Sequence, residues 1–109
     1  ILDQWIKPGH SLWQRRISIV STWMSIRNWQ YGKTLERAEA LLDSREDLLH
    51  KAAGWMLREV WKRGGMEEVE DFLDRNVERM PSVMLSYTCE KMAPQHRTYW
   101  RERRRNHKS

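Results

Sequence analysis

Turn-forming residues interrupt this chain at short intervals, and no segment between them has the alternating pattern of a strand. Pro8-Gly9 closes an opening segment, and Ser11 can cap the helix that follows. The chain is therefore predicted to be all-α. The predicted helices span about residues 11–29, 34–42, 46–63, 66–80, 82–92 and 94–105, with boundary signals at Gly32, Thr34, Gly64-Gly65, Pro81 and Pro94.

Six helices joined by short turns predict antiparallel helical pairs stacked side by side. We expect an α-solenoid of the HEAT or armadillo type, with residues 1–109 as a single domain. A compact orthogonal bundle is the alternative. Because the chain does not open on methionine, we expect it to be the C-terminal fragment of a longer protein. Composition predicts a disordered basic tail over residues 105–109.

The net charge of +5 is spread unevenly along the chain. Residues 7–63 and 97–109 each carry an excess of five positive charges, whereas residues 64–96 carry an excess of four negative charges. A basic face on the first helices would orient the molecule toward a polyanion. The acidic run 66–74 is interpreted as the solvated outer face of a helix.

Several function classes are excluded by what the sequence lacks. No apolar run is long enough to cross a bilayer, so we expect no membrane partner. Cys89 is the only cysteine, which rules out an internal disulfide and favours a reducing, cytoplasmic location. The four histidines are scattered without zinc-site spacing, and no phosphate-binding glycine loop or nucleophile elbow occurs. We therefore predict neither a metal nor a cofactor.

Helical geometry turns Trp55 away from the core side of the helix predicted at 46–63. Its neighbours on that side are Lys51, Arg58 and Lys62. A large aromatic ring among cations is typical of contact with nucleic acid. The alternative is that a second helical layer covers Trp55 and the cations extend around it. Gly54 costs about 1 kcal/mol relative to alanine inside a helix, which predicts close packing or close approach at that point.

The first long helix carries an apolar arc over roughly half its circumference, more than one flat interface requires. Arg16 projects near the middle of this arc, where an unpaired guanidinium is costly. We expect Arg16 either to have a carboxylate or carbonyl partner inside the protein or to line a cleft. Arg15 lies at the edge of the arc and is expected to reach outward. The arc consists of Leu12, Trp13, Ile17, Ile19, Val20, Trp23, Met24 and Ile26.

Two segments together resemble the C-terminal half of the AlkD-like DNA alkylation repair family. The first is Ser11-Leu-Trp-Gln-Arg-Arg-Ile-Ser-Ile-Val20, and the second is Asp43-Ser-Arg-Glu-Asp-Leu-Leu-His-Lys-Ala-Ala-Gly-Trp-Met-Leu-Arg-Glu59. The similarity continues through 69–73 and 80–87, so it covers most of residues 11–92. The pairing of Trp-x-Arg-Arg-Ile with Lys-Ala-x-Gly-Trp-x-Leu-Arg-Glu is the specific part, because either segment alone is a weak signal.

The resemblance implies a HEAT-like solenoid whose concave, basic face holds double-stranded DNA. Family members include glycosylases that excise cationic alkylated bases, such as 3-methyladenine and 7-methylguanine, without the base flipping usual for glycosylases. No metal or cofactor takes part. By motif position, Arg16 matches the arginine that contacts the DNA backbone near the lesion, and Trp55 matches a cleft tryptophan that packs on the deoxyribose. The helical wheel alone favours Arg15 for the phosphate contact, so Arg15 is the alternative.

One departure from the family pattern limits the activity that we expect. The family's catalytic aspartate lies in an earlier helix, and Asp3 is too close to Arg16 to take that role. We therefore expect a monomer that binds DNA, in a bacterial type of cytoplasm and associated with the nucleoid, but that cannot excise bases efficiently by itself. The competing hypothesis is a non-catalytic helical-repeat module that binds DNA structure or a protein partner.

Overall fold

The computed structural model describes the backbone of residues 2–108 and the side chains of residues 4–106. Over this range the regular structure is helical and no strand occurs, which confirms the all-α prediction. The elements are α1 (Leu2–Trp5), α2 (Leu12–Val20), α3 (Trp23–Arg27), α4 (Gly32–Ala40), α5 (Asp47–Lys62), α6 (Met66–Asn76), the 3-10 helix η1 (Val77–Arg79), α7 (Ser82–Thr88) and α8 (Pro94–Lys108).

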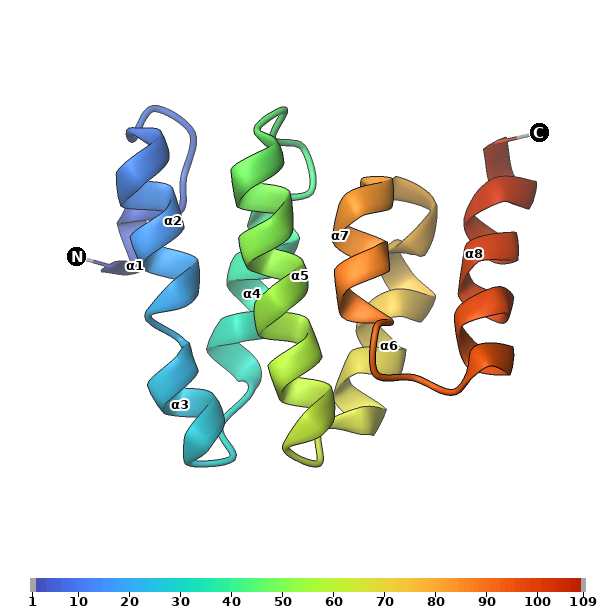
Figure 1. Ribbon diagram of the computed structural model, residues 1–109. Helices are drawn as coiled ribbons and strands as arrows, with labels where there is room; N and C mark the ends of the chain where they lie inside the picture. The colour runs from blue at the N-terminus through green and yellow to red at the C-terminus, as the bar shows by residue number, and fades with distance from the viewer. Residues whose placement is uncertain (1, 109) are drawn as a thin grey trace.

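The helices stack in two layers (Figure 1). Helices α2, α3, α5 and α7 form one row, and α4 and α6 lie behind it. Helix α5 is central, because it packs on α2, α4, α6 and α7. Helix α8 closes the stack beyond α7 and packs on η1. This is the side-by-side arrangement of a helical-repeat fold, as the sequence predicts.

Gly54 lies where α5 and α7 touch. A Cβ at this position would be 2.6 Å from the Cβ of Tyr87 and 2.7 Å from the carbonyl oxygen of Met84. Both distances are far below van der Waals contact, so only glycine lets the two helices approach this closely. The close-packing reason predicted for Gly54 is thereby confirmed.

The long first helix predicted over 11–29 is in fact two helices, separated at Ser21-Thr22. The hydroxyl of Thr22 donates to the carbonyl of Ile19 (2.7 Å), and the hydroxyl of Ser21 donates to the carbonyl of Ser18 (2.8 Å). Buried Arg37, from α4, also donates to the Ser18 carbonyl, at 2.7 Å. These bonds satisfy carbonyls at the end of α2 and stabilise the break.

Three other predicted boundaries are confirmed. Ser11 forms a capping box with Gln14, in which each side chain binds the other residue's backbone N–H. Helix α5 ends just before Gly64, whose φ of +96° suits glycine. Pro94 is the first residue of α8.

The cap predicted at Thr34 is wrong. Helix α4 begins two residues earlier, at Gly32, and Thr34 is buried inside it. The buried Thr34 hydroxyl has no hydrogen-bond partner among the described residues, so it caps no backbone N–H. At the other end of the chain, α8 runs to Lys108, through most of the segment 105–109 for which composition predicts disorder. That expectation stays a prediction, and Ser109 lies outside the described residues.

Substituting Gly54 tests the contact between α5 and α7. We expect Gly54→Ala to lower the free energy of unfolding by about 1–3 kcal/mol through overpacking, although alanine by itself favours a helix. Gly32→Ala is the matched control, because a Cβ there has no atom within 4 Å. Urea unfolding followed by tryptophan fluorescence measures both variants. Equal stabilities for the two variants would contradict the packing argument.

Candidate nucleic-acid interface

Arg16 lines a hollow between the first turns of α2 and α5. Its guanidinium lies over the ring of Trp13, 5.7 Å from the ring centre. Among the described side chains, Arg16 has neither an ion pair nor a hydrogen bond. Of the two placements expected for it, an internal partner or a cleft, the structure has the cleft. The hollow, called here the Arg16 hollow, encloses about 620 Å³ and is lined by Ser11, Leu12, Trp13, Arg16 and Leu48.

The apolar arc of α2 and α3 faces the core on one side only. Ile19 and Ile26 are buried, whereas Trp13, Ile17 and Met24 are exposed by 66%, 43% and 59%. The arc is wider than one flat interface requires, and its outer part is left open. Trp13, from this open part, lies with Leu12 and Leu48 around Arg16, so the cation lies beside apolar side chains.

Trp55 is half-buried and packs against the core. Its placement lies between the two interpretations of the sequence, since it is neither sealed in nor fully open. Leu48 precedes it by seven residues, close to two helical turns, so the two side chains share one face of α5 about 10 Å apart along the axis. Trp55 and the Arg16 hollow thus lie on the same face of α5, which packs on α2.

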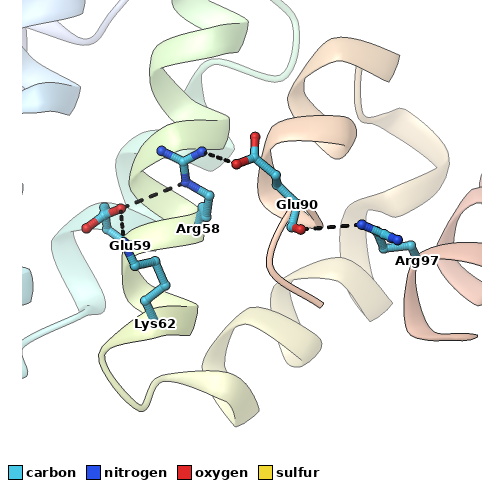
Figure 2. A network of polar contacts seen from close by, with 5 residues as sticks. All are labelled: Arg58, Glu59, Lys62, Glu90 and Arg97. Atoms are coloured by element: carbon cyan, nitrogen blue, oxygen red, sulfur yellow. Dashed lines mark hydrogen bonds and ion pairs between the residues drawn. The ribbon is translucent and has the colours of Figure 1, made fainter. Parts of the chain in front are cut away.

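The cations predicted around Trp55 are not all open to a ligand (Figure 2). Arg58 donates to Glu90 at 2.8 Å and lies 3.8 Å from Glu59. Lys62 lies 3.4 Å from the same Glu59 carboxylate. Arg58 and Lys62 of the predicted basic stripe therefore each lie beside a carboxylate. Lys51 is exposed and makes no ion pair with any described side chain.

Arg15 does not reach outward as expected. Its Nε–H donates to the carbonyl oxygen of Ile6 at 2.8 Å, and its side chain is half-buried. The bond ties the segment after α1 to α2. Because this contact joins residues nine positions apart across a turn, the helical wheel of α2 does not reveal it.

Sequence reasoning missed Glu90 and the role of Trp13. Glu90 follows α7 and is 32 residues from Arg58, so no helical spacing links the two. Trp13 was assigned to the core arc, although its ring lies beside Arg16 and is exposed. The only signal for the latter was the three-residue spacing of Trp13 and Arg16, which places both on one helix face.

Other site types find no support in the described part of the chain. Within it, no three His, Cys, Asp or Glu side chains are grouped to hold a metal ion. No described helix has the length and apolar character of a membrane span.

The fold and this interface define a helical-repeat protein with an arginine and an aromatic ring at one hollow. A family model described as DNA alkylation repair enzyme matches residues 1–92, and the chain belongs to that family. The resemblance noted in the sequence is thus confirmed, and its functional context is the repair of alkylated DNA. Comparisons with curated proteins and with solved structures found no match.

The ion pair of Arg58 with Glu90 generates a prediction. We expect Glu90→Gln to tighten binding to duplex DNA by roughly twofold to fivefold, because Arg58 then binds a phosphate without first breaking an ion pair worth up to about 1 kcal/mol. Glu36→Gln removes the same charge from an exposed residue of α4 that has no ion pair with a described side chain. Fluorescence anisotropy with a labelled duplex compares them. An equal gain in DNA affinity for both variants would show that net charge, and not release of Arg58, causes the change.

Proposed function

We propose that this chain binds double-stranded DNA as part of a DNA glycosylase, a hydrolase that excises cationic alkylated bases such as 3-methyladenine and 7-methylguanine without base flipping. The observation that carries the proposal is the Arg16 guanidinium, which lies beside Trp13 without an ion pair to any described side chain. Membership of the DNA alkylation repair family supplies the substrate context.

In this proposal Arg16 binds a backbone phosphate and sets the register of the duplex. Guanidinium groups suit this role because their planar fork donates to two phosphate oxygens at once. The exposed Trp13 ring on one side keeps the guanidinium in place. Lys51, exposed on α5, adds a further phosphate contact.

Trp55 contacts the deoxyribose next to the lesion. A cationic base leaves with the electron pair of the C1′–N bond and becomes neutral, while the sugar gains oxocarbenium character. The negative face of an indole ring stabilises such a positive centre. Water then adds to C1′ and loses a proton to a base. The sugar contact is therefore the part of the chemistry that Trp55 can supply.

Among the described side chains that line the Arg16 hollow, none carries a carboxylate that could act as general base for the water. This observation favours a second candidate function, a module that recognises alkylated or distorted DNA without cleaving it. Both candidates share a monomer bound to duplex DNA, in the cytoplasm and associated with the nucleoid. They differ only in whether the glycosidic bond breaks.

DNA affinity tests the assignment of Arg16 and Trp55. We expect Arg16→Gln and Trp55→Ala each to weaken binding of an alkylated duplex by roughly 5–50-fold, about 1–2 kcal/mol, through loss of a phosphate contact and of ring contact with the sugar. Arg63→Gln, an exposed arginine just after α5, controls for net charge. Anisotropy titrations measure affinity, and circular dichroism verifies folding. Unchanged affinities in both variants would show the assignments to be wrong.

Base release distinguishes the two candidate functions. We expect the 109-residue chain to release 7-methylguanine from methylated DNA no faster than spontaneous depurination, because the Arg16 hollow lacks a carboxylate to activate water. Chromatography of the released bases measures the rate, with an active alkylpurine glycosylase as the positive control. Enzymatic release that Trp55→Ala abolishes would instead establish catalysis by this chain alone.

A further inference from the structure

A second hollow, called here the α8 arginine site, lies between α7 and the later turns of α8. It encloses about 290 Å³, less than a typical cofactor pocket. Three arginines of α8 meet two hydroxyl groups of α7 there. The lining residues are Ser82, Leu85, Ser86, Arg101, Arg104 and Arg105.

The arginines of this site lack the acidic partners that Arg103 possesses. Arg103, on the same helix, pairs with Asp74 at 2.6 Å and with Glu78 at 3.3 Å. Within the described side chains, Arg101, Arg104 and Arg105 form no ion pair with a carboxylate. The α8 arginine site therefore carries three positive charges, and none of its described lining residues is acidic.

Helical spacing makes this concentration of charge electrostatically unfavourable without an anion. Residues at i, i+3 and i+4 share one helix face, so Arg101, Arg104 and Arg105 repel one another. Arg104 cannot simply turn away, because its Nε–H donates to the carbonyl oxygen of Met80 at 2.6 Å and its side chain is half-buried. The charge of Arg101 also reaches the protein interior, where it opposes the effect of burial that raises the pKa of Cys89 to about 11.

We propose that the α8 arginine site binds a phosphate of the DNA backbone, separate from the contact assigned to Arg16. Guanidinium groups and serine hydroxyls are the usual protein donors to phosphate oxygens. The arginines lie beyond residues 1–92, so the family match does not include them. The proposal rests on the proposed DNA binding and adds a second anchoring point to it.

The position of the two hollows suits a duplex. Helices α2, α5 and α7 all begin at the same edge of the stack in Figure 1. The Arg16 hollow includes Leu12, the first residue of α2, and the α8 arginine site includes Ser82, the first residue of α7. The longest dimension of the molecule, 38 Å, is close to one helical turn of B-DNA, about 34 Å. Phosphates on one duplex can therefore reach both ends of the row.

The test compares two double variants that each remove two positive charges. Arg101→Gln with Arg105→Gln alters the site while keeping Arg104 and its bond to Met80. Lys33→Gln with Arg63→Gln is the control, since both cations are exposed, have no ion pair with a described side chain, and lie where α4 begins and α5 ends, at the edge opposite the starts of α2, α5 and α7. Anisotropy of a fluorescein-labelled 20-base-pair duplex is measured from 50 to 300 mM salt. These conditions give the slope of log affinity against log salt.

We expect the site variant to lose about one unit of salt slope and roughly tenfold in affinity, because one phosphate contact contributes about 0.9 units. The control is expected to keep nearly the full slope. Equal slopes in the two double variants would overturn the α8 arginine site. If the site variant unfolds, Arg101→Lys with Arg105→Lys replaces it, because this variant keeps both positive charges. Its slope of log affinity against log salt must then match that of the unaltered chain.

Further comparisons separate this inference from the proposed function. If Arg16→Gln weakens binding but the α8 variant equals its control, only the α8 arginine site is wrong. If the α8 variant weakens binding but Arg16→Gln and Trp55→Ala do not, the site stands and the Arg16 and Trp55 assignments fail. Vesicles of phosphatidylserine and phosphatidylcholine provide a second anionic probe. Vesicle binding by a chain that does not bind duplex would overturn the assignment to DNA.

Discussion

The contact of α5 with α7 at Gly54 is the constraint on which the rest of this structure depends. A helix-interior glycine costs about 1 kcal/mol relative to alanine, and here it lets the α7 backbone approach to a distance that no side chain would allow. Because α5 also packs on α2, α4 and α6, this contact positions α7 relative to the whole stack. It thereby brings Glu90 within reach of Arg58, and it sets the wall against which α8 places its arginines.

Charge pairing divides the cations of the molecule into two groups. Arg58, Lys62 and Arg103 lie next to carboxylates that compensate them. The arginines of the Arg16 hollow and of the α8 arginine site have no such partner among the described side chains. Repulsion between neighbouring guanidinium groups is unfavourable, so the three arginines that meet at the α8 arginine site are informative about a ligand. An anion that spans both hollows would supply the missing charge, and DNA is the anion that the family context provides.

Local chemistry made much of the fold predictable. Ser11 and Gln14, three residues apart, form a helix cap. Gly64 follows the end of α5 because glycine readily adopts a positive φ, and Pro94 begins α8 because its fixed φ suits the first helical position. The break at Ser21-Thr22 escaped prediction because apolar periodicity continues across it. Arg37, sixteen residues beyond Ser21, contributes to that break, and a linear pattern does not reveal such a contact.

For the interface, the sequence by itself determined which residue types were present and which helix face carried them. Arg16, Trp55 and Gly54 were singled out in this way, from helical geometry and from the family motif. Only the tertiary structure decided how each charge is compensated, since ion pairs such as Arg58 with Glu90 join segments whose separation no periodicity relates. It likewise turned Arg15 toward the Ile6 carbonyl and left Trp13 exposed. The physical reason is that helix propensity and amphipathicity act over a few residues, whereas burial and charge pairing depend on which helices the packing makes neighbours.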